Sequence, residues 1–274
     1  MNKMSNRLAL HTWSLDTTPL VETLRAASDG GWNAVELRRI DFTRCFDQGM
    51  SNDQVIALVR ESGMKVAVIG TEYGLIFAKG DESKRLMGVL DETCRNAKAL
   101  GCDMIMIAPG QRSGTVKEAA ANFRSAGEVV GAHGLRIALE FNSVHDVING
   151  LEVGREVVSL TNHPACGLLL DAYHMERSGS GGRSFEDMSR EEIFAFQFSD
   201  VPPGPPPAGG RPTDRLMPGQ GRVRWKEVFG LLAEKGYDGY LSYEAPNPVY
   251  WSRPPGEVAQ EAAHATRGLL ASVQ

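Results

Sequence analysis

The chain has 274 residues, of which 42% are hydrophobic and 23% charged, and its formal net charge is −5. Such a composition is typical of a globular protein and excludes a disordered, collagen-like or fibrous chain. The acidic balance also counts against nucleic-acid binding, which needs a basic surface to neutralise phosphates.

The N-terminal segment and the cysteines indicate where such a protein works. The first apolar stretch, residues 8–10, is far too short for a signal-peptide core or a membrane span. The four cysteines show no Cys-x-x-Cys spacing, which favours free thiols in a reducing compartment over a disulfide framework. We therefore expect a cytoplasmic protein with no membrane partner.

A repeated unit runs through the chain: a helix-like stretch, then a glycine, then four or five apolar residues. The glycines that end these stretches are Gly31, Gly63, Gly101, Gly134 and Gly236. Glycine suits this place because a helix commonly ends on a left-handed residue, which glycine adopts without a Cβ clash. The short apolar runs are typical of parallel strands that are buried on both faces.

These runs predict eight strands. In chain order they lie near Leu8, Ala34, Val66, Ile105, Ile137, Leu168, Phe194 and Leu241. Each gap between them is long enough for a crossover helix. Eight such units predict an α/β fold, a (β/α)8 TIM barrel that forms one domain over residues 1–274. The alternative is a doubly wound open sheet, which usually has a glycine-rich phosphate loop after its first strand; residues 10–14 are not such a loop.

The longest gap, between the seventh and eighth strands, begins with a run of prolines and glycines at residues 201–210. Such a stretch cannot continue a helix or a strand. Because it follows the carboxyl end of a strand, where barrels build their active sites, we expect residues 201–221 to form a loop over the mouth of the site. A surface insertion without a function is the alternative.

Polar residues at the carboxyl ends of the strands are the candidates for that site. Four of them, Glu140, Asp171, Gln197 and Glu244, end strands five to eight. Three carboxylates that converge on one cavity need compensating positive charge, which one divalent cation supplies. Oxygen donors favour Mn²⁺ or Mg²⁺ and tolerate Co²⁺, whereas Zn²⁺ prefers more nitrogen or sulfur. The alternative is that these residues cap helices or pair with arginines.

Other polar residues are candidates for substrate contacts. His174, one turn after Asp171, can donate to a substrate oxygen, and Arg38 can bind an oxyanion unless it pairs with Glu36 or Glu72. The remaining members of this set are His11, Glu72, Asn142 and Arg222, and Arg215 is a further candidate for a phosphate or carboxylate. By contrast, four histidines have the sequence context of surface residues: His133, His145, His163 and His264.

Five segments together resemble the sugar phosphate isomerase/epimerase family, the xylose-isomerase-like barrels. The segments are Ile137-Ala-Leu-Glu-Phe141, Leu169-Leu-Asp-Ala-Tyr-His174, Phe196-Gln-Phe-Ser-Asp200, Pro218-Gly-Gln-Gly221 and Ser242-Tyr-Glu244. The resemblance covers nearly the whole chain and is nearest to the 2-keto-myo-inositol (inosose) isomerases and the bacterial 3-dehydroshikimate dehydratases. It implies that Glu140, Asp171, Gln197 and Glu244 bind the metal and that His174 contacts the substrate. Many relatives have histidine in place of Gln197, and dehydratase-like members carry glutamine.

The activity that this resemblance implies is a divalent-metal-dependent isomerase or epimerase of a ketose or polyol ketone. The metal polarises the carbonyl, and Glu140 or Glu244 removes the neighbouring proton while the other returns it. One alternative ends in loss of water, as in a 3-dehydroshikimate dehydratase, and another is a non-catalytic sugar-binding barrel. A DNA-repair nuclease on the same barrel would need more histidines and a basic groove.

The partners expected from the sequence are a small sugar or polyol ketone and further copies of the same chain. Barrels of this family are usually dimers or tetramers, so we expect a homodimer or homotetramer. Tyr73 and Trp251, in the loops after strands three and eight, are candidates for that interface or for the substrate cleft.

Overall fold

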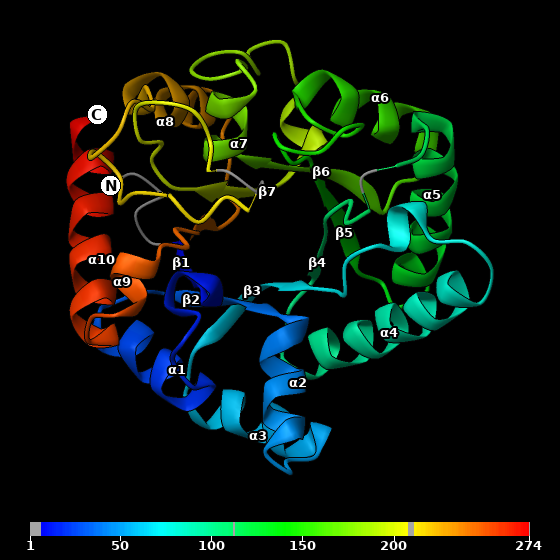
Figure 1. Ribbon diagram of the computed structural model, residues 1–274, viewed down its shortest axis with the longest axis horizontal. Helices are drawn as coiled ribbons and strands as arrows, with labels where there is room; N and C mark the ends of the chain where they lie inside the picture. Colours follow the sequence, from blue (N-terminus) through cyan, green and yellow to red (C-terminus); the bar gives the residue numbers. More distant parts are fainter. Residues whose placement is uncertain (1–6, 112, 208–210, 274) are drawn as a thin grey trace.

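A computed structural model of the chain describes residues 7–111, 113–207 and 211–273. Eight parallel strands close into a barrel, and each strand pairs with its neighbour in the sequence, from β1 to β8 and back to β1. Figure 1 shows the strands at the centre of the molecule with the helices arranged around them. The predicted (β/α)8 barrel is therefore confirmed.

The strands include all eight predicted positions. Their bounds are Leu8–His11 (β1), Ala34–Arg38 (β2), Lys65–Gly70 (β3), Met104–Ile107 (β4), Arg136–Glu140 (β5), Cys166–Asp171 (β6), Ile193–Phe198 (β7) and Leu241–Tyr243 (β8). The described α-helices are Leu20–Asp29 (α1), Arg39–Asp47 (α2), Asn52–Glu61 (α3), Gly80–Ala99 (α4), Val116–Ala132 (α5), Leu151–Thr161 (α6), Ala172–Arg177 (α7), Trp225–Glu234 (α8), Pro248–Trp251 (α9) and Pro255–Ser272 (α10). Short 3₁₀ helices span Thr12–Leu15 (η2), Leu75–Phe77 (η3) and Arg190–Glu192 (η4).

The glycines that follow the helices take the predicted left-handed conformation. Gly31, Gly63, Gly101, Gly134 and Gly236 have φ values of 76°, 72°, 68°, 72° and 67°. Each therefore lets the chain leave its helix and enter the next strand without the clash that a Cβ atom brings in this conformation.

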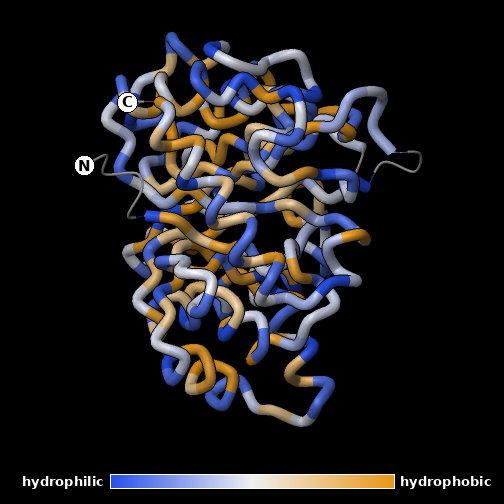
Figure 2. Tube along the Cα trace, turned by 90° about the vertical axis from the view of Figure 1, so that its left-hand side faces the viewer, coloured by the Kyte–Doolittle hydropathy of each residue, from blue (hydrophilic) through white to orange (hydrophobic). Residues whose placement is uncertain are grey.

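Side chains alternate along each strand between the barrel interior and the surrounding helices. The interior layer is built mostly from small residues, among them Ala9, Ala34, Ala138 and Ala195, and is closed by Leu169. Neighbouring strand residues pack outward in a second, larger core with the buried faces of the helices. In Figure 2 hydrophobic stretches in orange alternate with hydrophilic stretches in blue along the outer parts of the chain, as expected for helices with one buried face.

The same alternation places the candidate polar residues inside the barrel. In a strand, the side chain two residues further toward the carboxyl end faces the same way, so it again points inward after each of the five residues just named. The residues in these positions are His11, Glu36, Glu140, Asp171 and Gln197. The register agrees, since His11 lies opposite Glu36 and Asp171 lies opposite Gln197.

The segment between β7 and α8 leaves the barrel and returns to it at one point. Asp200 and Leu216 exchange two backbone hydrogen bonds, of 2.8 and 3.0 Å, and so close the base of this loop. Part of the proline- and glycine-rich stretch, residues 208–210, lies outside the described residues. Whether residues 201–221 cover the mouth of the site therefore stays a prediction.

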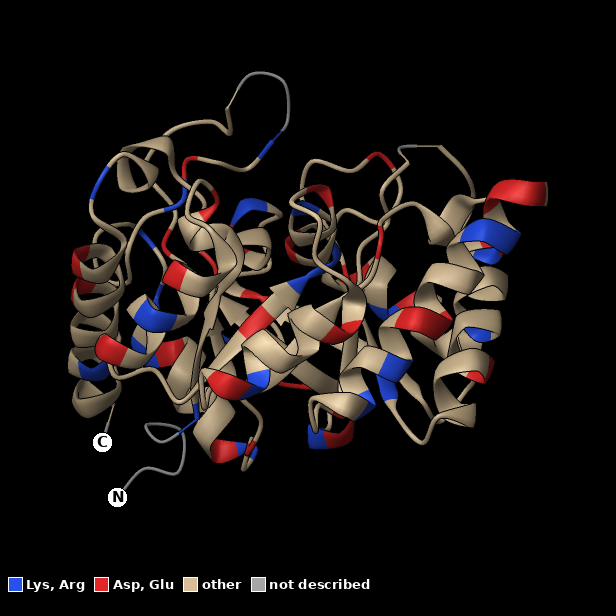
Figure 3. Ribbon diagram, turned by 90° about the horizontal axis from the view of Figure 1, so that it is seen from below, with Lys and Arg blue, Asp and Glu red and all other residues tan. Residues whose placement is uncertain are grey.

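The surface carries charges of both signs. In the ribbon of Figure 3, Lys and Arg positions in blue are interspersed with Asp and Glu positions in red along the helices. Within the described ranges, no helix combines the length and the apolar character that crossing a bilayer requires.

Candidate active site

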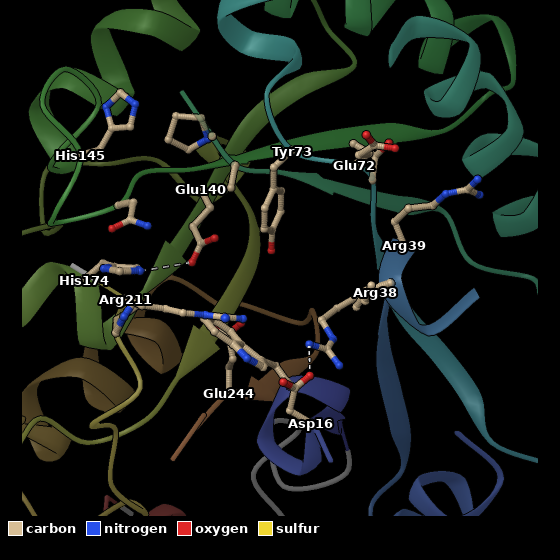
Figure 4. Close-up of a pocket in the computed structure, with 18 of the residues that line it drawn as sticks. Asp16, Arg38, Arg39, Glu72, Tyr73, Glu140, His145, His174, Arg211 and Glu244 are labelled. Atoms are coloured by element: carbon tan, nitrogen blue, oxygen red, sulfur yellow. Dashed lines mark hydrogen bonds and ion pairs between the residues drawn. The ribbon is translucent and has the colours of Figure 1, made fainter. Parts of the chain in front are cut away.

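A cavity of about 600 Å³ opens at the carboxyl ends of the strands. Glu140 at the end of β5, His174 on α7 and Glu244 just after β8 line it (Figure 4). Tyr73, from the loop after β3, points its hydroxyl into the same space. On the opposite side Arg211 lies over the ring of Trp13, with 5.2 Å between the guanidinium carbon and the ring centroid.

Two buried carboxylates pair with one guanidinium group at the bottom of this cavity, and a third carboxylate lies beside His174. Arg215 Nη1 lies 2.6 Å from Asp171 Oδ2 and 2.8 Å from Glu244 Oε2. The third carboxylate, Glu140, places Oε1 at 3.7 Å from Nε2 of His174. Three potential ligand atoms lie within 4.8 Å of one another, one each from Glu140, Asp171 and His174.

His174 is held in place by the loop after β5. Its Nδ1 accepts a hydrogen bond of 3.2 Å from the backbone N–H of Ser143 and lies 2.9 Å from the hydroxyl of the same residue. The other ring nitrogen, Nε2, therefore faces the carboxylates and lies 3.0 Å from Arg215 Nη2. Burial and the charge of Arg215 lower the pKa of His174 to about 3, so the ring is neutral at physiological pH.

Three further polar side chains, on β1, β2 and β7, are fully buried and are not among the described residues that line the cavity. Gln197 is fully buried and donates from Nε2 to Glu36 Oε1 over 2.8 Å. His11 accepts the backbone N–H of Trp13 at Nδ1 over 3.0 Å, which leaves Nε2 at 3.2 Å from Glu244 Oε1 and 3.7 Å from Glu36 Oε1. These contacts connect β1, β2 and β7 to the carboxylate of Glu244.

Burial makes the carboxylates hard to ionise. It raises the pKa of Glu36 to about 8 and that of Glu244 to about 7, although Arg215 opposes the rise at Glu244. Burial and repulsion from Glu244 and Asp171 raise the pKa of Glu140 well above its usual value. Burial alone would lower the pKa of Arg215, but Asp171 and Glu244 hold it above its usual value.

These groups fit a divalent cation. Three carboxylates share the single positive charge of Arg215, which leaves negative charge that a cation would neutralise. The carbonyl oxygen of Gln197 is buried and has no hydrogen-bond partner in the part of the chain that the structure describes. Oxygen donors of this kind suit Mn²⁺ or Mg²⁺, and the adjacent nitrogen of His174 also suits Zn²⁺ or Co²⁺.

The positive charge that compensates the carboxylates therefore agrees only in part with the sequence prediction. The sequence favours a metal, with pairing to arginines as the alternative, and groups Arg215 with Arg38 and Arg222 as candidates for binding a phosphate or carboxylate. The structure places Arg215 among the carboxylates, from a loop far along the chain. The unbalanced charge of the three acids was the signal that a cationic side chain belonged there.

The predicted substrate-binding residues are spread over the cavity and its surroundings. Arg38 lines the wall, but its guanidinium is held by Thr12 Oγ1 at 2.9 Å, Asp16 Oδ1 at 2.8 Å and Asp41 Oδ1 at 3.0 Å. The alternative that Arg38 pairs with Glu36 or Glu72 is wrong. These contacts come from η2, from the residue that follows it and from the first turn of α2, which no strand-end pattern reveals.

Two further candidates, Glu72 and Asn142, line the cavity, whereas a third, Arg222, does not. Glu72 pairs with Arg85 at 2.5 Å, and Asn142 Oδ1 accepts the backbone N–H of Val144 at 3.1 Å. Arg222 is half exposed, lies 3.8 Å from Glu176 and is not among the described residues that line the cavity.

One histidine lies elsewhere than predicted. His145 was expected at the surface, but it is buried, stacks on Phe77 with 5.5 Å between ring centroids, and lines the cavity. Its Nδ1 accepts the backbone N–H of Ile148 at 2.9 Å. The burial of His145 could not be predicted from its place in a loop, because Phe77, which covers it, comes from a distant part of the chain.

Asp200 organises the loop that carries Arg215. It is fully buried, and its two oxygens accept the backbone N–H groups of Val223 and Gly219 at 2.9 and 2.8 Å. Oδ2 of Asp200 also accepts the indole Nε1–H of Trp225 at 2.9 Å. The carboxylate thus ties the end of β7 to the start of α8 and fixes the segment from which Arg215 reaches the site.

Comparison with known proteins gives relatives over most of the chain. The chain is 24% identical to the inosose isomerase of Halalkalibacterium halodurans over 264 residues, which cover 92% of each protein. It is 26% identical to the 3-dehydroshikimate dehydratase of Pseudomonas putida over 96% of its own length but only 41% of that protein. Among solved structures, an IOLI protein with a bound zinc atom superposes with a TM-score of 0.87 at 20% identity, over 98% of this chain and 99% of the other.

A family model agrees with this fold and with the sequence resemblance. The model for the xylose isomerase-like TIM barrel matches residues 24–269, which are most of the chain. The match begins in α1 and ends in α10. This chain belongs to the xylose isomerase-like TIM barrel family.

Proposed function

We propose that the protein is a divalent-metal-dependent isomerase or epimerase of a small ketose or polyol ketone. The observation that carries this proposal is the pair Glu140 and Glu244, two carboxylates with raised pKa values that line one cavity of about 600 Å³. A carboxylate whose pKa lies near neutral pH is suited to accept and to return a proton. The similarity to inosose isomerases supports the same reaction class.

The metal would be held by Glu140, Asp171, Gln197 and Glu244, with His174 beside them. When bound, a divalent cation supplies Lewis-acid polarisation of a substrate carbonyl. Glu140 or Glu244 takes the proton from the carbon next to that carbonyl, and the other carboxylate returns a proton at a different carbon or face. Arg215 lies beside Glu244 and neutral His174 beside Glu140, and both side chains would orient the substrate's oxygens.

A dehydratase is the second candidate. The specific observation in its favour is Gln197, since the sequence resemblance implies a glutamine at this place in dehydratase-like members of the family. The Pseudomonas putida 3-dehydroshikimate dehydratase also aligns over 96% of this chain. The first proton transfer would be the same, but a hydroxyl on the next carbon would then leave as water.

The test is proton exchange in deuterated buffer. The protein is stripped of metal, reloaded separately with Mn²⁺, Mg²⁺, Co²⁺ or Zn²⁺, and offered inosose, free ketoses and 3-dehydroshikimate. We expect metal-dependent incorporation of deuterium beside the carbonyl, followed by nuclear magnetic resonance. A conjugated product that absorbs in the ultraviolet identifies the dehydratase, and an isomer without that absorbance identifies the isomerase.

Two results would count against the proposal. Exchange that is unchanged after metal removal would contradict the metal dependence. Bound metal without exchange in any of these substrates would favour a non-catalytic binding barrel. We also propose that the protein acts in the cytoplasm as a homodimer or homotetramer, which light scattering of the purified protein tests.

A further inference from the structure

Several arginines line the cavity, and most of them are balanced by acids of the protein itself. Four of them form ion pairs with carboxylates: Arg38 and Arg44 with Asp16, Arg39 with Glu92, and Arg215 with Asp171 and Glu244. An anion that enters the cavity has to compete with a carboxylate for each of these guanidinium groups.

Arg211 differs from these four. It lines the same cavity, but no carboxylate in the described part of the chain forms an ion pair with it. Asp214, three residues further along, is engaged elsewhere, since it pairs with Arg177 at 2.5 Å and accepts the hydroxyl of Tyr173 at 2.5 Å. Within the described chain, the positive charge of Arg211 is therefore left for a ligand.

The neighbours of Arg211 hold it in place. Its guanidinium carbon lies 5.2 Å from the centroid of the Trp13 ring, whose face attracts a cation. Its backbone carbonyl accepts the N–H of Thr213 over 2.8 Å. Trp13 is itself anchored, because its carbonyl accepts the indole N–H of Trp251 over 3.1 Å. An arginine that stacks on a ring still presents the N–H groups in its plane to a carboxylate or phosphate.

The two ends of the cavity differ in charge. Arg211 is exposed, whereas Glu140 and Glu244 are buried, so Arg211 lies nearer to the solvent. The buried carboxylates repel an anion, and the unpaired guanidinium attracts it. A cavity of about 600 Å³ is in the range that encloses a whole small ligand, so a sugar bound there has its two ends in these different surroundings.

We propose that Arg211 binds an acidic group of the substrate, a carboxylate or a phosphate ester, at the end away from the reacting ketone. This inference rests on the proposed function only in taking the cavity as the substrate site. With the acidic end held by Arg211, the ketone is directed toward Glu140 and Glu244. Arg211 is then a residue that determines specificity: it selects acidic over neutral sugars and takes no part in proton transfer.

Three sugars with the same pyranose ring test this inference: D-glucose, D-glucuronate and D-glucose 6-phosphate, which differ only at carbon 6. Their dissociation constants for the Mn²⁺-reloaded protein are measured by ligand-observed nuclear magnetic resonance at one ionic strength. We expect at least one of the two acids to bind about 10- to 100-fold more tightly than glucose, because hydrogen bonds between charged groups are strong. Tighter binding of glucuronate identifies a carboxylate substrate, and tighter binding of the 6-phosphate identifies a phosphate ester.

Substitutions show whether Arg211 is the source of this preference. Arg211→Gln should bind the three sugars with similar affinity, and Arg211→Lys, which keeps the charge without the planar fork, should retain part of the preference. The matched control is Arg224→Gln, because Arg224 pairs with Glu227 at 3.1 Å and is not among the described residues that line the cavity. This control should keep the full preference, and circular dichroism checks that each variant is folded.

The outcomes separate this inference from the proposed function. Equal affinity for the three sugars, or a preference that survives Arg211→Gln, overturns the inference. Metal-dependent deuterium exchange on a neutral ketose would leave the proposed function intact in that case. If the preference depends on Arg211 but no substrate shows metal-dependent exchange, Arg211 binds anions and the proposed reaction is wrong.

Discussion

Glu140 and Glu244 share a cavity but have different neighbours. Glu244 lies 2.8 Å from Arg215 Nη1 and 3.2 Å from His11 Nε2, whereas Glu140 has the ring of neutral His174 at 3.7 Å. The cation beside Glu244 limits the rise of its pKa to about 7, and Glu140 lacks a charge so close. Two carboxylates with different basicity are suited to transferring one proton in opposite directions.

At this scale we predict that Glu140→Gln and Glu244→Gln each lower kcat by about 10²- to 10⁴-fold, because an amide cannot accept the proton. Both variants keep the size of the side chain, so the cavity keeps its shape. Turnover is followed by nuclear magnetic resonance on the substrate found active with the parent protein. Glu152→Gln on α6 is the control, and full activity of either site variant would contradict the assignment.

The element that decides the site beyond the strands is the loop between β7 and α8. Its base is closed by Asp200 and Leu216, and Asn247 Nδ2 donates to the carbonyl of Arg215 over 2.9 Å. The loop is thus attached on both sides of the residue that it brings to the carboxylates. This attachment lets a chain segment without helix or strand hold a guanidinium at a fixed place.

Asp200→Asn tests this attachment. The amide has one acceptor oxygen where the carboxylate has two, so a buried donor, from Gly219, Val223 or Trp225, loses its partner. We expect the free energy of unfolding in urea to fall by about 1–3 kcal/mol and KM to rise as Arg215 loses its position. Asp238→Asn removes an exposed carboxylate that pairs with Arg190 and should change stability by less than about 0.5 kcal/mol. Equal effects of the two substitutions would show that the loop is held by other contacts.

At the edge of the cavity, the loop after β3 and the loop after β4 approach each other at two glycines, Gly74 and Gly110. Gly110 follows β4, and a Cβ atom there would lie 2.5 Å from the backbone nitrogen of Gly74. Gly74 itself has a φ of 106° and follows Tyr73, which points into the cavity. Close approach of the two backbones therefore sets the position of this aromatic residue.

We predict that Gly110→Ala destabilises the protein and raises KM by displacing Tyr73. The comparison is Gly63→Ala, because Gly63 has the same φ of 72° as Gly110 but nothing within 4 Å of a new Cβ atom. Gly63→Ala should therefore cost only the backbone strain, about 1–2 kcal/mol in urea unfolding. The difference between the two variants measures the contact between the loops, and no difference would show that the loops adjust without cost.

Across the whole molecule, the buried acids link stability to pH. Above about pH 6.5 the unfolded chain has ionised carboxylates and neutral histidines. The folded, metal-free protein still holds protons on Glu36 and Glu244, whose pKa values are raised to about 8 and about 7. The native state therefore binds more protons than the unfolded state, and its stability falls as pH rises through this range.

Urea unfolding in a chelator between pH 6.5 and 8.5 checks this prediction. The free energy of unfolding should decrease toward pH 8.5 in the parent protein, because the raised pKa of Glu36 makes ionisation in the barrel unfavourable. Glu36→Gln removes one of the groups and should flatten the slope. A parent protein whose stability is constant over this range would show that Glu36 and Glu244 ionise there as freely as in the unfolded chain.

The sequence by itself determined the barrel and the ring of polar residues at its mouth. Strand length, helix-ending glycines and the alternation of side chains are local properties, so they place Glu140, Asp171, Gln197 and Glu244 on consecutive strands without knowledge of the fold. The family match over residues 24–269 agrees with that reading of the chain.

Only the tertiary structure decided which groups meet inside the ring. Arg215 and His145 come from loops, and the partners of Arg38 lie just after η2 and on α2, so no periodic pattern marks these contacts. The contact between Glu36 and Gln197 joins strands that are 161 residues apart in the chain. Barrel closure creates such neighbours, because it brings the first and last strands together, and burial then decides which charges must be paired.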